Sequence, residues 1–234
     1  MANDAVLTAA QMRAAEDEAI AGGTSVEELM RRAGVGAAEW VWRMAAGHSV
    51  TVLCGPGNNG GDGYVLAEAI RRKGGAVKVV APLEPATEAA KAARAAYDGE
   101  VVGRDGPYTG IAGAVLVDCL FGTGFKRKLT PDLVELLMDL AEAHRTVVAV
   151  DIPSGIDADT GAVLASHFRK CGSRLRSARS SRRISCRARP EIAASFASST
   201  LVSRWRPRRF ACWTARARRR LPATATSTIA AWSA

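Results

Sequence analysis

Apolar and polar residues alternate at helical spacing along the start of the chain. Thr8 and Gln11 form a capping-box pattern, which predicts a helix that ends at Gly22-Gly23. Ser25, followed by Glu28 three residues later, repeats this start signal. Apolar side chains then recur with a helical period at Leu29, Ala33, Ala37, Trp40, Val41 and Met44. The pattern therefore predicts a pair of helices at the N-terminal end.

Short apolar runs follow at regular intervals and predict buried strands. These strands are expected at residues 49–54, 76–81, 114–120 and 146–152, with helices between them at 63–73, 84–97 and 130–144. Apolar strands that alternate with helices are typical of a parallel sheet covered on both faces. We therefore expect an α/β fold, a Rossmann-like three-layer αβα sandwich with a mainly parallel sheet. In such sheets, ligands bind beyond the carboxyl ends of the strands.

The first predicted strand ends in a glycine-rich loop, GPGNNGGDG, at residues 55–63. Gly55, Gly57 and Gly60 have the GxGxxG spacing, so backbone N–H groups at the start of the following helix could cradle a phosphate. A plain tight turn is the alternative interpretation. The next strand ends in VVAP, residues 79–82, without the acid that holds a ribose in NAD dehydrogenases, which argues against that class.

Polar side chains also follow two later strands. Asp118 and Asp151 stand at strand ends, on the same expected rim of the sheet as the NNGGD segment, residues 58–62. Each Asp taken alone could simply cap the next helix. Together with the hydroxyl of Ser154, these oxygens suit a hard cation, and a carboxylate among them could transfer protons.

Three segments in this order resemble the signature segments of the NAD(P)H-hydrate epimerase family, also called YjeF N-terminal-like. They are GPGNNGGDGYVLA at 55–67, VDCLFGTGF at 117–125 and VDIPSGIDADTG at 150–161. The two leading helices resemble the helical pair of that family. The resemblance covers about two thirds of the chain.

The resemblance implies a site that is shared by the three loops. It implies that the substrate contacts Asn58, Asn59, Gly60, Gly61, Asp62, Gly122, Thr123, Gly124, Phe125, Lys126, Arg127, Lys128 and Asp151. It implies a potassium ion held by Asn59, Asp118 and Ser154. The family interconverts the R and S forms of hydrated NADH and NADPH, so that a partner dehydratase can repair both. Because family members are often dimers, a homodimer is a further expectation.

Epimerisation of this substrate requires an acid–base group. The hydrated carbon is a hemiaminal, and losing and regaining hydroxyl, or opening and closing the ring, needs only proton transfer. We expect Asp151 to be catalytic, with Asp62 as the second candidate, and the sequence does not decide between them. A non-catalytic nucleotide- or RNA-binding scaffold of the same fold is the alternative function.

Histidines and cysteines indicate no competing site. His48, His144 and His167 lie outside the three loops and are expected at the surface. The five cysteines form no CxxC pair, and Cys54 and Cys119 are expected as buried core residues. The chain shows neither a signal-peptide pattern nor an apolar run long enough for a membrane, so we expect a cytoplasmic protein.

Charge divides the chain into two parts. The net charge of the whole chain is +9. Residues 1–165 hold 15 basic and 22 acidic residues, a net charge of −7. Residues 166–234 hold 17 basic residues and one acid, a net charge of +16. We therefore expect an epimerase-like domain at 1–165 and an Arg-, Ser- and Ala-rich tail at 166–234.

Three interpretations of the tail compete: a nucleic-acid-binding arm, a disordered extension and translation in the wrong frame. A basic arm usually mixes Lys with Arg, whereas Lys170 is the one lysine of the tail, so we do not expect nucleic-acid binding. Codons for Ser173–Ala188 can be chosen so that the shifted frame reads TVTFGALKPAHLMPG, which resembles the next segment of the family. This favours a frameshift near residues 165–172. We therefore expect missing C-terminal strands and an impaired activity.

Overall fold

The computed structural model of the chain describes residues 8–165 and, within the tail, the backbone of residues 202–205. The predictions made for His167, Lys170 and the segment 173–188 lie outside the described residues. No helix in the described part is long and apolar enough to cross a membrane.

The described residues form helices and strands that alternate along the chain. In order, these are α1 (Ala9–Ala21), α2 (Val26–Ala45), β1 (Val50–Cys54), α3 (Asn58–Arg72), β2 (Val77–Val80), α4 (Glu88–Ala96), β3 (Val101–Val102), β4 (Gly113–Cys119), α5 (Pro131–Ala143), β5 (His144–Val150) and β6 (Val202–Trp205). Each predicted helix and strand is present, and the two-residue β3 and the tail strand β6 were not predicted.

One sheet carries all six strands in the order β3-β2-β1-β4-β5-β6. Strands β1 to β5 are parallel to one another, as predicted for a mainly parallel sheet. The register aligns Asp118 of β4 with Leu53 of β1 on one side and with Ala149 of β5 on the other. The loops that follow β1, β4 and β5 therefore leave the same edge of the sheet.

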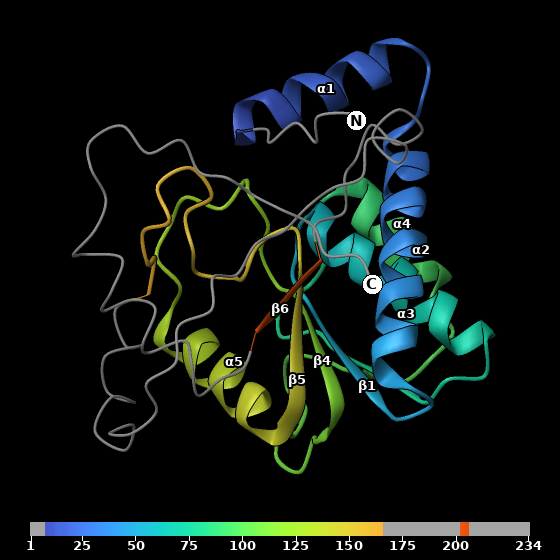
Figure 1. Cartoon of the computed structure of the whole chain (residues 1–234), viewed down its shortest axis with the longest axis vertical. Helices are drawn as coiled ribbons and strands as arrows, with labels where there is room; N and C mark the ends of the chain where they lie inside the picture. The colour runs from blue at the N-terminus through green and yellow to red at the C-terminus, as the bar shows by residue number, and fades with distance from the viewer. Residues whose placement is uncertain (1–7, 166–201, 206–234) are drawn as a thin grey trace, which may run out of the picture.

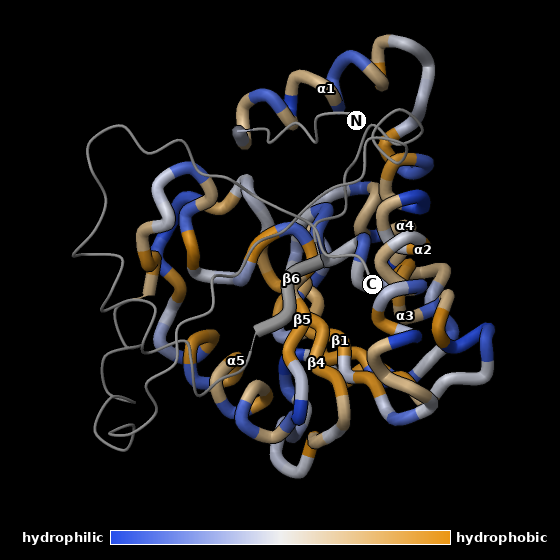
Figure 2. Tube along the Cα trace, viewed as in Figure 1, coloured by the Kyte–Doolittle hydropathy of each residue, from blue (hydrophilic) through white to orange (hydrophobic). Residues whose placement is uncertain are grey.

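Helices cover both faces of this sheet (Figure 1). Helices α2, α3 and α4 pack on one face around a core that includes Val41, Val52 and Tyr64. Helix α5 covers the other face, where Leu137 packs with Leu116 of β4. Figure 2 shows the central strands as the most hydrophobic part of the trace, with hydrophilic residues on the helices around them. The predicted three-layer αβα sandwich is confirmed.

Strand β6 covers the outer edge of β5 (Figure 1). It runs antiparallel to β5, with Val150 aligned to Val202 and Val147 aligned to Trp205. The tail thus contributes one strand at the place where we expect later strands of the fold to be missing. An unpaired strand edge invites association with other chains, so this pairing removes a hazard that the bare edge would carry.

Helix α3 begins at Asn58 rather than at Gly63, with Gly57 as its N-cap. The NNGGD segment is therefore the first turn of a helix and not a loop. Glycine is required at two points because backbones meet there. A Cβ at Gly55 would lie 1.7 Å from the carbonyl oxygen of Leu120, and a Cβ at Gly60 would lie 1.9 Å from that of Gly55. These contacts hold the N-terminus of α3 against the ends of β1 and β4.

Helix α1 lies apart from the three layers, above the loops that follow the strands (Figure 1). The predicted capping box is present, with the Gln11 side chain accepting from Thr8 N at 2.9 Å and Thr8 Oγ1 accepting from Gln11 N at 3.2 Å. The N–H of Ala9 donates to Asp159 Oδ1 at 3.2 Å. This bond ties the first turn of α1 to the loop that follows β5.

His144 is buried, so its predicted surface position was wrong. Its exposed fraction is 5 %, its Nδ1 bonds to the carbonyl of Leu140, and its Nε2 lies 2.8 Å from Thr51 Oγ1. With the proton on Nδ1, the neutral ring donates to Leu140 and accepts from the Thr51 hydroxyl. His48 is exposed, as predicted.

The buried position of His144 predicts a loss of stability in mild acid. Burial lowers the pKa of His144, against the opposing effect of its bond to Leu140. The unfolded chain therefore takes up this proton first, near pH 6.5, and the free energy of unfolding falls as the pH drops from there towards the lower folded pKa. Urea unfolding at about pH 7.5 and about pH 5.5 measures the difference. We expect His144→Gln to reduce it and His48→Gln to leave it unchanged; an unchanged difference in His144→Gln would contradict the assignment.

Candidate active site

Asp118 forms a buried hydrogen-bonded cluster at the end of β4. Its side chain is 0 % exposed. Its Oδ1 accepts from Ser154 Oγ at 2.6 Å and from Leu120 N at 3.2 Å, while its Oδ2 accepts from Ser154 N at 2.8 Å. Ser154 Oγ in turn accepts from Phe121 N at 2.9 Å. These bonds hold the loop after β5 on the end of β4. Burial raises the pKa of Asp118, whereas the hydrogen bonds from Ser154 and Leu120 lower it, and burial has the larger effect.

Asp151 follows β5 directly and adopts the left-handed backbone conformation, with φ at 67°. Its Oδ2 accepts from Thr123 N at 2.6 Å. A Cβ at Gly122 would lie 2.4 Å from this oxygen and 3.4 Å from Cβ of Asn59. The structure therefore brings Asn59 of the first turn of α3, Gly122 and Thr123 after β4, and Asp151 after β5 together at one rim.

Asn59 carries a buried amide without a protein partner. Neither its Oδ1 nor its Nδ2 has a hydrogen bond to the described residues. Since nearly all buried polar atoms are paired, such an amide is available to a ligand or an ion. Asn58 is exposed, and its Oδ1 accepts from the hydroxyl of Thr87 at 2.8 Å, at the N-cap of α4.

Three carboxyl groups lie within electrostatic range at this rim: Asp62 of α3, Asp151 and Glu16 of α1. Burial is the main cause that raises the pKa of each of them. For Asp62, whose pKa is raised well above its ordinary value, the charges of Asp151 and Glu16 add to the effect. For Asp151, the hydrogen bond from Thr123 N lowers the pKa and so opposes the effect of burial. The group therefore keeps protons to a higher pH than exposed carboxylates do.

Glu16 was missed in the sequence analysis. Partly buried side chains recur on α1 at Met12, Ala15, Glu16 and Ala19, which is the spacing of an inward helical face. An acid on this face was the signal that could have identified it. Helix α1 thereby contributes to the site.

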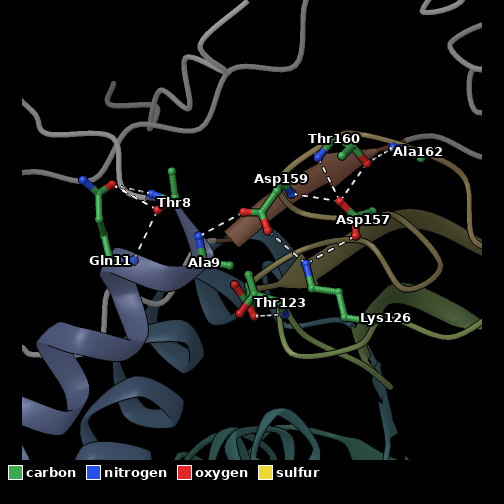
Figure 3. A network of polar contacts seen from close by, with 10 residues as sticks. Thr8, Ala9, Gln11, Thr123, Lys126, Asp157, Asp159, Thr160 and Ala162 are labelled. Atoms are coloured by element: carbon green, nitrogen blue, oxygen red, sulfur yellow. Dashed lines mark hydrogen bonds and ion pairs between the residues drawn. The ribbon is translucent and has the colours of Figure 1, made fainter.

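Lys126 points to the loop after β5 rather than standing free. Its Nζ lies 2.9 Å from Asp159 Oδ2 and 3.3 Å from Asp157 Oδ2. Asp159 also accepts from Ala9 N, so this carboxylate joins Lys126 to the N-terminus of α1 (Figure 3). A substrate phosphate at Lys126 would have to compete with these two carboxylates.

The remaining predicted substrate residues lie in two different surroundings. Phe125, Arg127 and Lys128 line a cleft along α5. Gly60 and Gly61 are buried, and a Cβ at Gly61 would lie 2.4 Å from the methyl group of Met30. A Cβ at Gly124 would meet nothing within 4 Å. The two buried cysteines, Cys54 and Cys119, are free and 0 % exposed, as predicted.

Comparisons with known proteins place the chain in a family. Residues 26–175 match the family described as YjeF-related protein N-terminus. An NAD(P)H-hydrate epimerase of Rhodobacter capsulatus is 40% identical over 172 residues, which cover 67% of this chain and 80% of the relative. One of Achromobacter xylosoxidans is 38% identical, covering 66% of this chain and 75% of the relative.

Two further relatives are informative. A bifunctional NAD(P)H-hydrate repair enzyme of Synechocystis is 32% identical over 68% of this chain but only 31% of its own length. The crystal structure of yeast YNL200c has a TM-score of 0.56 and 26% identity, covering 68% of this chain and 75% of that one. With a family match over more than half of its residues and a 40% identical relative covered over most of its length, the chain belongs to the YjeF-related protein N-terminus family.

Proposed function

We propose that this chain interconverts the R and S forms of hydrated NADH and NADPH, with Asp151 as the acid–base group. The observation that carries the proposal is the partly buried carboxyl of Asp151, held by Thr123 N next to Asn59 at the shared rim. The relatives named NAD(P)H-hydrate epimerase support the reaction and the substrate class. The relatives named as bifunctional repair enzymes support a dehydratase as functional partner.

Proton transfer by Asp151 accounts for the inversion. The raised pKa of Asp151 favours the protonated form, which can donate to the hydroxyl of the hemiaminal carbon. The hydroxyl leaves as water while the ring nitrogen forms a C=N bond to the carbon. Water then adds to the opposite face, and Asp151 takes back the proton. Ring opening and closing would use the same donor and acceptor.

Asp62 serves a second role in this proposal. Its pKa is raised well above the ordinary value by burial and by the charge of Asp151. An ionised Asp151 therefore favours the protonated form of Asp62, and a protonated carboxyl can donate a hydrogen bond. Asp62 would therefore hold a hydrogen bond to the substrate, and it is the alternative acid–base group.

Potassium is proposed as the bound ion, with Asn59, Asp118 and Ser154 as its ligands. The unpaired amide of Asn59 and the buried carboxylate of Asp118 fit a hard monovalent cation. Among the described residues, no group of three or more His, Cys, Asp or Glu could hold a metal ion, so amide and hydroxyl oxygens would have to contribute. When bound, the ion would offset the charge of Asp118 and hold the strand-end loops together.

Replacing sodium by potassium should stabilise the protein if this proposal holds. An ion present at ten times its Kd adds about 1.4 kcal/mol to the free energy of unfolding, or roughly 3–6 °C in Tm. Thermal unfolding in KCl and in an equal concentration of NaCl measures the effect. We expect Asn59→Ala to abolish the difference between the salts and Asn58→Ala to preserve it. The same shift in Asn59→Ala would remove Asn59 from the ligand set.

The reaction itself is tested with an S-specific dehydratase. The R hydrate of NADPH is supplied, and its disappearance is followed with and without the folded chain. We expect the chain to accelerate the loss of the R form and Asp151→Asn to remove the acceleration. No acceleration by a folded wild-type sample would count against the enzyme and favour a non-catalytic scaffold.

The homodimer and the cytoplasmic location complete the proposal. Exposed apolar side chains at Ile20, Val35 and Trp40 offer contact area for a second copy, and light scattering of the purified chain tests this.

The free thiols of Cys54 and Cys119 suit a reducing compartment such as the cytoplasm.

A further inference from the structure

A cleft of about 960 Å³ lies beside the candidate active site, on the face of the sheet that α5 covers. One wall is formed by α5, and the other by residues 104 and 108–111, which connect β3 with β4. Pro56, Pro82 and Phe121, which follow β1, β2 and β4, also line it. The cleft therefore reaches the edge of the sheet at which Asp151 lies.

Aromatic rings form the part of this cleft that is nearest to the site. Phe121 and Phe125 are stacked, with ring centroids 4.0 Å apart and an angle of 24° between their planes, and both line the cleft. Phe125 is two residues from Thr123, whose N–H holds Asp151, so the two Cα atoms are at most about 7 Å apart. A dinucleotide with its nicotinamide ring at Asp151 can thus reach the aromatic wall.

Three cations line the cleft without an ion pair to the described residues: Arg104, Arg127 and Lys128. Arg127 and Lys128 belong to the segment that begins at Gly122, whereas Arg104 comes from the opposite wall. The Tyr108 hydroxyl lies 2.9 Å from the carbonyl oxygen of Arg104, which holds the backbone of that wall. Acids of α5, namely Asp132, Glu135 and Asp139, also line the cleft and would repel a phosphate from the helix side.

We propose that this cleft binds the adenylate half of the dinucleotide hydrate, and that Arg104 selects the 2′-phosphate of NADPH hydrate. The inference rests on the proposed function, since the nicotinamide end has to lie at Asp151. Arg127 and Lys128, close along the chain to Thr123, then meet the pyrophosphate. The adenine contacts Phe125, and the 2′-phosphate of the adenosine ribose lies against Arg104. Aromatic faces bind a base, and guanidinium groups bind phosphate with two parallel hydrogen bonds.

Binding of two stable probes by the full chain tests this inference without requiring epimerisation. ADP-ribose and its 2′-phosphorylated form contain the adenylate half and lack the nicotinamide, and calorimetry measures their Kd. We expect Arg104→Gln to raise the Kd of the 2′-phosphorylated probe about tenfold or more, the usual loss for a bond to a charged group, and that of ADP-ribose less than about threefold. Phe125→Leu should raise the Kd of both probes.

Arg145→Gln is the matched control, because Arg145 is an exposed arginine on β5 and does not line the cleft. It should leave both Kd values unchanged. In the epimerase assay, Arg104→Gln should raise KM for NADPH hydrate and leave kcat and the values for NADH hydrate unchanged.

The outcomes separate the inference from the proposed function. If Arg104→Gln raised the Kd of both probes equally, or left both Kd values unchanged, the role given to Arg104 would be overturned. A chain that epimerises the hydrates but binds neither probe would overturn the cleft and leave the reaction intact. A chain that binds both probes with the expected Arg104 effect, yet does not epimerise, would support the cleft and refute the enzyme.

Discussion

Replacing Asp151 by Asn lowers the rate of hydrate epimerisation by about 10²- to 10⁴-fold, the usual contribution of a positioned acid–base group. Asn is the right substitution because it tolerates the left-handed conformation that Asp151 adopts, with φ at 67°. Its amide oxygen can still accept from Thr123 N. The backbone and the loop contact should therefore persist while the transferable proton is lost. The coupled dehydratase assay with the R hydrate measures kcat and KM.

Raised proton affinity adds a pH dependence to this prediction. Because burial raises the pKa of Asp151, the acid form persists to a higher pH than in an exposed Asp, and the wild-type kcat should fall as the pH rises through that value. Asp17→Asn removes an exposed carboxylate of α1 and should leave the rate unchanged. Wild-type activity in Asp151→Asn, combined with a large loss in Asp62→Asn, would transfer the role to Asp62.

A single methyl group at Gly60 should destabilise the fold by about 3 kcal/mol, at the upper end of overpacking costs. The new Cβ would lie 1.9 Å from the carbonyl oxygen of Gly55. Because this neighbour is backbone, no change of rotamer relieves the clash, and the N-terminus of α3 has to move away from β1. We expect Gly60→Ala to lower Tm by roughly 6–12 °C. Thermal unfolding followed by circular dichroism measures it.

Gly57→Ala is the control for this effect. A Cβ at Gly57 would meet nothing within 4 Å, and the backbone there has a φ of −95°, which any residue adopts. Loss of glycine at the N-cap should cost less than about 1 kcal/mol. If both variants lost the same stability, the close approach of α3 to β1 would not be the cause.

Local sequence patterns were sufficient for most of the secondary structure. The capping box at Thr8 and Gln11 is present as predicted, and the apolar run expected at 114–120 is the strand Gly113–Cys119. These features depend on neighbours within a few residues, where side-chain periodicity and capping act. The resemblance of three loops to one family identified the residues that meet at the rim, including Asp118, Ser154 and Asp151.

Tertiary contacts decided what local patterns could not. The sequence predicted the third helix to begin at Gly63, after the glycine-rich loop. Helix α3 nevertheless begins at Asn58, since only glycine at position 60 allows its first turn to approach Gly55. His144 is buried because it meets Thr51, which is 93 positions away in the sequence.

The same distinction between local sequence and tertiary structure applies to the candidate active site. The sequence by itself determined which carboxylates and amides stand at strand ends. Only the tertiary structure decided that the charge of Glu16 on α1 acts on Asp62, that Lys126 pairs with Asp157 and Asp159, and that Arg127 lines a separate cleft. The physical reason is that desolvation and charge–charge interactions depend on distance in space, and residues far apart in the chain acquire that distance only when the sheet and its loops are assembled.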